Sequence, residues 1–378
     1  MNRDLKLVIL AITTWGFGEG LFLLFQPLYL EELGASPLLI GAIMGGIGLA
    51  MSIAHIPAGY LADRFGRRPL LIAAWLLGST ALWVMALANS IQIFVIGSAL
   101  YAVTAFVISP LNSYVTAARG KLTVGRVLTI TSAAFNLGAI GGPLLGGWIG
   151  ENIGLRYNFM LAAIIFVIST LIILNIRSQP VENFPPGEKR SIKREIFTAR
   201  YIRYLQVVFF VMFALYLPQP LSQNFLLNER AVNLIQIGIL LSVRRAGVVF
   251  LNLTLGRLSA SFGFILAQVA MGLFTLIIWQ GTGIPWYILG YMLMGSYQTA
   301  RALVSAQVRS LVSAANMGLA FGTVETTNSI AIILAPPIAG YLYTQNPETI
   351  YLTSFILICA GIIITLLFSP VKIKSVRA

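Results

Sequence analysis

The sequence predicts an all-α integral membrane protein in which twelve transmembrane helices form two pseudo-symmetric six-helix bundles. Three observations support this fold class. Of the 378 residues, 58% are hydrophobic and 10% are charged, long apolar segments recur along the whole chain, and Lys and Arg gather in alternate connections. Soluble domains carry about 25% charged residues, so this composition, with a mean hydropathy of +0.86, indicates a chain that folds in lipid.

Twelve segments are long enough to cross the hydrocarbon core, which takes about 20 apolar residues. They divide into two groups of six, separated by the polar, Pro-containing and basic segment 177–200. We therefore expect an N-terminal bundle at 1–176, a cytoplasmic linker loop at 177–200 and a C-terminal bundle at 201–378. The predicted spans are 6–30, 37–61, 70–89, 91–117, 126–150, 155–176, 202–227, 233–256, 262–282, 285–310, 317–343 and 350–369.

The distribution of basic residues sets the expected orientation. If the N-terminus is inside, twenty of the 25 Lys and Arg residues fall on the cytoplasmic side, and Arg156 and Arg230 fall outside. This bias follows the positive-inside rule and predicts a multi-pass protein of the plasma (cytoplasmic) membrane with both termini in the cytoplasm. The net charge of +13 then reflects topology and attraction to anionic lipid, and no nucleic-acid partner is expected.

The two halves resemble each other at an offset of 197 residues. The segment 59–66, GYLADRFG, aligns with 256–263, GRLSASFG, and Gln26 aligns with Gln223. Near the fifth and eleventh spans the offset becomes 194, where Pro143 meets Pro337. Two similar halves are typical of transporters that expose a central site alternately to each side of the membrane.

The connection between spans two and three carries a specific motif, 59–68, GYLADRFGRR. Its glycines permit a tight turn, and Asp63 can pair with a guanidinium. This segment resembles the signature loop of the major facilitator superfamily. The resemblance implies a latch at the inner gate, and simple anchoring by positive charge is the alternative. The residues concerned are Gly59, Asp63, Arg64, Gly66, Arg67 and Arg68.

Span five contains a second motif, 138–147, GAIGGPLLGG. Glycines four residues apart form a flat ridge that lets another helix approach closely, and Pro143 removes a backbone donor. The motif is similar to the Gly-Pro motif of the family's drug–proton antiporters and so indicates export; a packing ridge without influence on direction is the alternative. The packing residues are Gly138, Gly142, Pro143, Gly146 and Gly147. Those antiporters usually carry an arginine in span four, whereas 91–117 contains no charge.

Five charged residues lie well away from the ends of the predicted spans, where a charge costs several kcal/mol unless it is paired or hydrated. Glu19 and Glu325 are candidates for proton coupling, because a desolvated carboxyl can load and release a proton; permanent pairing with an arginine is the alternative for Glu19. Arg301 lies about 15 Å and Glu325 about 12 Å from the inner side, so we expect these two to form an ion pair.

Arg244, Arg245 and Arg301 are candidates for contact with an anionic substrate, because a guanidinium matches carboxylate and phosphate groups. Structural pairing is the alternative for all three. Arg244 and Arg245 point about 100° apart on a helix, so we expect one of them at most to face the cavity squarely. Gln26 and Gln223 are further cavity candidates, and interhelical hydrogen bonds are the alternative role for both.

Other classes of protein fit poorly. The chain has one His, one Cys and two Asp, so we expect no metal site, no prosthetic group and no enzymatic activity. The six tryptophans are predicted to be interface or lipid-facing aromatics. These observations favour a secondary transporter of small molecules, monomeric and driven by protons, with proton-coupled efflux as the leading interpretation. Proton-coupled import or exchange of an organic anion is the alternative.

Overall fold

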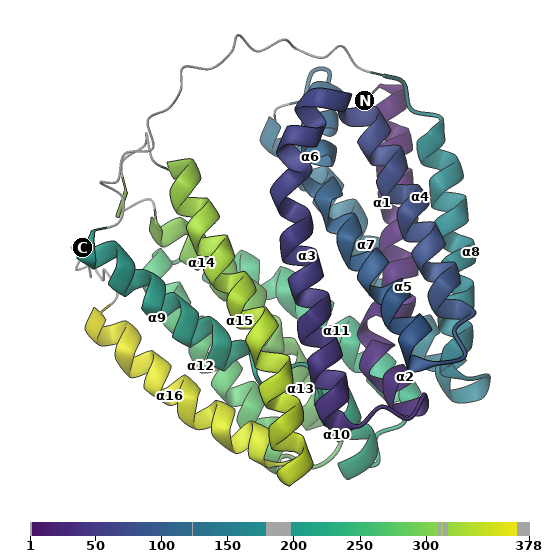
Figure 1. The fold of residues 1–378 in the computed structure, drawn as a ribbon. Coiled ribbons are helices and arrows are strands. Elements are labelled where there is room, and N and C mark those ends of the chain that lie inside the picture. Colours follow the sequence, from purple (N-terminus) through teal and green to yellow (C-terminus); the bar gives the residue numbers. More distant parts are fainter. Residues whose placement is uncertain (1, 123, 179–197, 309–310, 313–316, 369–378) are drawn as a thin grey trace. The chain divides into compact units, whose positions relative to one another are not determined.

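The computed structural model describes residues 2–122, 124–178, 198–308, 311–312 and 317–368, and for 55–65, 109, 124–125 and 317–319 it describes the helical backbone. The described chain is built from helices (Figure 1). In the first half these are α1 Arg3–Phe22, η1 Leu23–Phe25, α2 Gln26–Glu32, α3 Pro37–Phe65, α4 Arg67–Ala86, α5 Ile91–Val103, η2 Thr104–Val107, α6 Ile108–Ala117, α7 Val124–Asn152 and α8 Leu155–Leu174. In the second half they are α9 Ala199–Tyr216, α10 Ser222–Glu229, α11 Leu234–Leu255, α12 Ala260–Gln280, α13 Ile284–Met294, α14 Ser296–Val308, α15 Met317–Gln345 and α16 Thr349–Phe368.

Helices cover most of every predicted span. Ten of the described helical segments are long and apolar enough to cross a membrane, judged by length and composition. The predicted span 285–310 differs, because Gly295 separates α13 from α14. The predicted span 202–227 is interrupted by the turn 217–221, with prolines at 218 and 220, but its first part, α9, is among the ten. The chain is thus an all-α protein suited to a bilayer.

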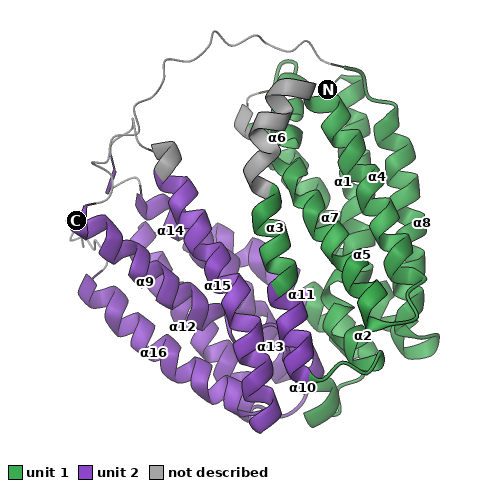
Figure 2. Cartoon of the chain, in the orientation of Figure 1, with its two compact units in different colours: residues 1–36, 46–186, 226–242 green, residues 37–45, 187–225, 243–378 purple. Residues whose placement is uncertain are grey.

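Two compact units divide the chain (Figure 2). Unit 1 comprises residues 1–36, 46–186 and 226–242, and unit 2 comprises 37–45, 187–225 and 243–378. The predicted domain boundaries, 1–176, 177–200 and 201–378, remain a prediction; most of the predicted linker lies outside the described residues.

Unit 1 has an aromatic and hydrogen-bonded interior. In it α1 packs against α7 and α8, and α4 packs against α5 and α8. Trp15 and Trp75 are buried side by side, with ring centroids 5.0 Å apart. The Trp75 indole N–H donates to Ser169 Oγ at 2.8 Å, and Ser169 donates to the carbonyl of Ala11 at 2.7 Å. The prediction that all six tryptophans face lipid or the interface is therefore wrong for Trp15 and Trp75, because each fills a gap between helices.

Unit 2 repeats this arrangement. In it α9 packs against α15 and α16, as α1 does against α7 and α8, and α12 packs against α13 and α16, as α4 does against α5 and α8. A short helix with several polar residues follows α1 and another follows α9 at the equivalent place in the repeat. Gln26 lies in the first of these, α2, and Gln223 in the second, α10. At the offset of 194 residues, the first and last residues of α8 align with the first and last residues of α16. The repeat that the sequence predicted is thus present in the helix order and in the packing.

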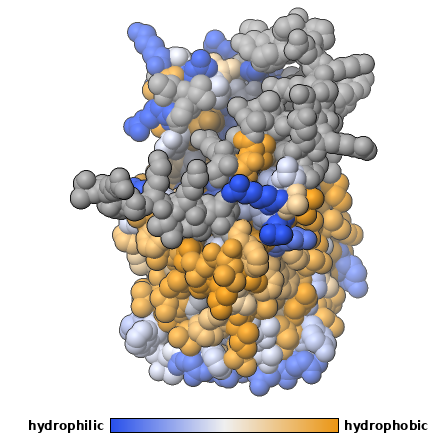
Figure 3. Space-filling view, turned by 90° about the vertical axis from the view of Figure 1, so that its left-hand side faces the viewer, coloured by the Kyte–Doolittle hydropathy of each residue, from blue (hydrophilic) through white to orange (hydrophobic). Residues whose placement is uncertain are grey.

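The surface is apolar where lipid would contact it. Figure 3 shows a broad hydrophobic face bordered below by hydrophilic residues. On α16 the exposed side chains include Ile356, Ile363, Leu366 and Leu367. Leaving such side chains in water is unfavourable by about 25 cal/mol per Å² of apolar area, so this face is stable in a bilayer.

Candidate functional site

A carboxylate inside α1 is held by a phenol from α5. The Tyr101 hydroxyl donates to Glu19 Oε2 at 2.7 Å. The Tyr101 ring stacks against Trp15 at 6.2 Å and meets Phe22 edge-on at 5.1 Å, so aromatic packing fixes the position of the hydroxyl. Glu19 itself is half-buried. The arrangement places an ionisable group inside a membrane span, with a donor that stabilises its charged form.

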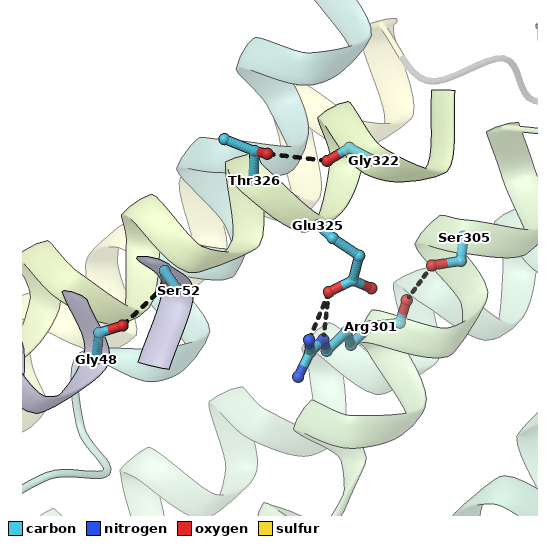
Figure 4. Close-up of polar contacts among 7 residues, drawn as sticks. All are labelled: Gly48, Ser52, Arg301, Ser305, Gly322, Glu325 and Thr326. Carbon is cyan, nitrogen blue, oxygen red and sulfur yellow. Dashed lines mark hydrogen bonds and ion pairs between the residues drawn. The ribbon is translucent and has the colours of Figure 1, made fainter. Parts of the chain in front are cut away.

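The predicted ion pair between α14 and α15 is confirmed. Arg301 Nε donates to Glu325 Oε2 at 3.2 Å, and Arg301 Nη2 faces the same oxygen. Figure 4 shows the guanidinium and the carboxylate pointing toward each other. The two side chains are 34% and 44% exposed, so the pair borders an open space and is not sealed in the core.

Arg244 and Arg245, one after the other in α11, have different surroundings. Arg244 Nη2 donates to Gln219 Oε1 at 3.1 Å, and Gln219 is buried in the turn between α9 and α10 and donates to the carbonyl of Leu215 at 2.8 Å. Arg244 also lies near Tyr216, Tyr291 and Tyr297. Arg245 is half-buried and takes part in other interactions. Arg244 therefore belongs to a polar cluster of unit 2.

Gln26 and Gln223 are both buried at the first turn of a short helix. Gln26 Nε2 contacts Met85 Sδ at 3.8 Å, and its buried Oε1 has no hydrogen-bond partner among the described residues. Gln223 Oε1 accepts from Ser222 Oγ at 3.3 Å. Both positions are equivalent in the repeat, but each side chain lies inside its own unit, so their role as cavity residues remains a prediction.

The signature loop is described only in part. Gly59, Asp63 and Arg64 are described as helical backbone alone, so the contacts predicted for Asp63 and Arg64 lie outside the described part of the structure. Gly66 has φ +79° and forms the N-cap of α4. This positive φ is the left-handed conformation that favours glycine. The α4 helix then begins with Arg67 and Arg68.

Arg68 reaches across to the end of α8. Its Nε donates to the carbonyl of Ile176 at 2.7 Å, and its Nη2 donates to the carbonyl of Leu174 at 3.3 Å. Carbonyls at a helix C-terminus lack intrahelical partners and attract cations. Arg68 thus fixes the point where the chain leaves α8, while Arg67 takes part in interactions of its own.

The glycine ridge of α7 contacts the backbone of α1. A Cβ added at Gly142 would lie 2.5 Å from the Phe17 carbonyl oxygen, and one at Gly146 would lie 2.9 Å from the Leu21 carbonyl oxygen. At Gly138 it would collide with the Thr13 carbonyl. These three glycines thus lie directly against the backbone of α1.

The other two residues of the motif contact a different segment as well. A Cβ at Gly147 would lie 2.5 Å from the Leu234 carbonyl oxygen, and Gly238 packs against the Pro143 carbonyl and against Gly147. Ser242 Oγ donates to the carbonyl of Ile140 at 2.9 Å. The start of α11, residues 234–242, thus lies against α7 within unit 1.

Sequence reasoning missed four polar partners of the predicted charges, namely Tyr101, Tyr216, Gln219 and Tyr297. Tyrosine was counted among the hydrophobic residues of the spans, and Gln219 lies between two prolines in a segment that was predicted to be continuous helix. The available signal was the hydroxyl itself, because a buried phenol usually finds a hydrogen-bond partner.

Fold and site together define a polytopic integral membrane protein of two helical repeats with ionisable side chains inside its spans. The model of the Major Facilitator Superfamily matches residues 8–223 and 207–377, and the chain belongs to this superfamily.

Individual relatives agree with this assignment. The chain is 30% identical to multidrug resistance protein MdtG of Klebsiella pneumoniae (strain 342) over 206 residues, which are 52% of this chain and 49% of that protein. It is 22% identical to multidrug resistance protein 1 of Bacillus subtilis (strain 168) over 385 residues, covering 99% and 98% of the two chains. The crystal structure of the nucleoside transporter NupG superposes with a TM-score of 0.81 at 17% identity, over 97% and 98% of the chains. The chain spans about half the length of several curated relatives it matches.

Proposed function

We propose that this protein is a secondary active transporter that exports small solutes in exchange for protons by alternating access. Membership of the superfamily supports transport, and relatives named as multidrug resistance proteins support export. The observation that carries the coupling to protons is Glu19, a half-buried carboxylate inside α1 that accepts a hydrogen bond from Tyr101 at 2.7 Å.

The chemistry of this pair suits a proton-loaded switch. When ionised, Glu19 can only accept hydrogen bonds, and the Tyr101 hydroxyl supplies one. When protonated, Glu19 gains a donor, so its preferred partners change. Glu19 would then alternate between two hydrogen-bonding patterns as a proton binds from the outside and leaves to the inside. The proton gradient would supply the energy for export without a bound prosthetic group.

The test uses purified protein in proteoliposomes with an imposed pH gradient and ethidium as the transported probe. Wild-type protein should move ethidium against its concentration gradient, and Glu19→Gln should keep downhill flux but lose acceleration by the pH gradient. Glu32→Gln, which alters an exposed carboxylate at the end of α2, is the matched control. Full proton-driven transport by Glu19→Gln would refute the assignment.

A second candidate function is proton-coupled import or exchange of an organic anion. Arg244 and Arg301 in unit 2 carry two positive charges against the one negative charge of Glu325, and this surplus favours an anionic solute. Measurement of the direction of benzoate flux under the same pH gradient separates the two functions, because import and export respond oppositely to reversal of the gradient.

We further propose that Asp63, with Arg64 and Arg67, latches the inner gate. We also propose that the protein lies in the cytoplasmic membrane as a monomer, with both termini in the cytoplasm. The bias of basic residues supports the orientation. Protease protection of terminal tags in right-side-out vesicles tests the orientation, and light scattering of the purified protein tests the oligomeric state.

A further inference from the structure

The polar cluster of unit 2 contains more hydrogen-bond donors than acceptors. Arg244 reaches it from α11, Tyr216 from α9, Tyr297 and Arg301 from α14, and Glu325 from α15. The rings of Tyr216 and Tyr297 lie 5.3 Å apart. Close contact between α11 and the α13–α14 junction holds the cluster together, because a Cβ on Gly295 would collide with the backbone of α11 at 247–248.

Tyr297 stands at the centre of this cluster. The residue is 2% exposed, and its hydroxyl has no hydrogen-bond partner among the described residues. Its electrostatic neighbours are Tyr216, Arg244, Arg301 and Glu325. A buried polar group without a partner costs about 1–3 kcal/mol, so an unpaired phenol beside two guanidinium groups requires an explanation.

The groups around this hydroxyl identify what it lacks. Guanidinium groups donate hydrogen bonds and accept none. Glu325 Oε2 already accepts from Arg301, and Gln219 Oε1 already accepts from Arg244. The missing component is an acceptor with negative charge.

We propose that Arg244, Tyr297 and Arg301 form a binding subsite for the carboxylate of a monoanionic organic substrate, with Tyr216 beside it. Arg244 and Tyr297 donate to the carboxylate oxygens, and the Arg301 N–H groups not used by Glu325 complete the site. This inference rests on the second candidate function, transport of an organic anion, and names the class of that anion.

Shape favours a carboxylate. Arg244 and Arg301 outweigh the single negative charge of Glu325, and Arg245 beside Arg244 adds to this surplus, so the cluster favours an anion over a neutral solute. A planar carboxylate matches the fork of a guanidinium. The paired rings of Tyr216 and Tyr297 offer an apolar surface beside it, so an aromatic acid suits the site better than an aliphatic one.

The experiment measures equilibrium binding to the full-length protein in lipid nanodiscs, without a pH gradient. The probes are benzoate, 1-naphthoate and indole-3-acetate, each compared with its neutral carboxamide, and benzylphosphonate as the dianion. Wild-type protein should prefer at least one carboxylate over its carboxamide by about tenfold or more, the ratio that a charge-assisted hydrogen bond supplies.

Substitutions assign this preference to the cluster. Arg244→Gln should abolish it, and Tyr297→Phe, which removes one oxygen atom and keeps the ring, should reduce it about threefold to tenfold. Arg203→Gln and Tyr341→Phe, which alter exposed residues of unit 2, should leave it unchanged.

Equal binding of acid and amide across all three pairs would overturn the proposal, as would a preference that survives both Arg244→Gln and Tyr297→Phe. A preference for benzylphosphonate over every carboxylate would overturn the assignment to a monocarboxylate. Because binding is measured without a gradient, a failure of proton coupling leaves this result intact, and the two proposals fail separately.

Discussion

Arg301 and Glu325 form an ion pair in which the guanidinium uses two nitrogen atoms on one carboxylate oxygen, Oε2. The pair joins α14 to α15 beside the Tyr297 hydroxyl. Glu325 and a substrate carboxylate would then compete for the same guanidinium. The pair is therefore both a link between helices and a control on how much of the Arg301 charge is available.

The first prediction is that neutralising Glu325 strengthens binding of a carboxylate. Glutamine at position 325 keeps the shape of the side chain and removes the charge that competes for Arg301, so Glu325→Gln should bind benzoate about tenfold more tightly than wild type. Binding titrations in nanodiscs measure this, and unchanged or weaker binding of benzoate by Glu325→Gln would contradict the competition.

The second prediction concerns Tyr101. Removing its hydroxyl takes away the hydrogen bond that Tyr101 donates to the Glu19 carboxylate. Proton-driven transport by Tyr101→Phe should therefore fall by about tenfold or more, since a hydrogen bond to a charged group contributes about 1.5–3 kcal/mol. Tyr157→Phe, which alters an exposed tyrosine of α8, is the control. A transport rate equal to that of the control contradicts the role of Tyr101.

The third prediction tests the contact between α1 and α7. Gly142→Ala places a Cβ 2.5 Å from the Phe17 carbonyl oxygen and 2.6 Å from the Gly20 Cα, and backbone on both sides leaves no flexible atom to yield. Overpacking of this kind costs about 1–3 kcal/mol. Thermal unfolding in detergent, followed by tryptophan fluorescence, should show a lower midpoint.

Gly46 and Gly322 provide matched controls for this substitution. A Cβ at either helical position has open space within 4 Å, so alanine there should be neutral or stabilise by about 0.5–1 kcal/mol through helix propensity. If Gly142→Ala and Gly46→Ala lowered the midpoint of thermal unfolding equally, the flexibility of glycine, and not its close contact with α1, would explain the effect in α7.

The repeat and the ion pair show what the sequence could predict. Span depth is a one-dimensional quantity, and counting residues from the inner side was enough to match Arg301 with Glu325. The glycine ridge followed from spacing on a helix for the same reason. Both inferences use the helix period alone, which is fixed before any tertiary contact forms.

The surroundings of the charges depend on three-dimensional packing and were not predictable in this way. Tyr101, which donates to Glu19, lies 82 positions away in the chain. Gln219, which accepts from Arg244, lies in a turn that the hydropathy pattern did not separate from α9. The burial of Trp75 likewise depends on distant residues, because its indole N–H donates to Ser169 of α8. The identity of a neighbour in a helical bundle is set by side-chain shape, which a hydropathy pattern does not record.

The fourth prediction comes from two equivalent turns with different residues. Gly34, between α2 and α3, has φ +91°, and Ala231, between α10 and α11, has φ +51°; the offset between them is the 197 residues of the repeat. A left-handed conformation costs a residue with a Cβ about 1–2 kcal/mol, while glycine loses more backbone entropy on folding. Ala231→Gly should therefore raise the free energy of unfolding by about 0.5–1 kcal/mol, and Gly34→Ala should lower it by a similar amount, since a Cβ there touches nothing within 4 Å. The thermal midpoints of the two single variants should shift in opposite directions. The double variant should have a midpoint close to that of the wild type. A loss of stability in Ala231→Gly would show that the methyl group of Ala231 contributes more through its contacts than its backbone conformation costs.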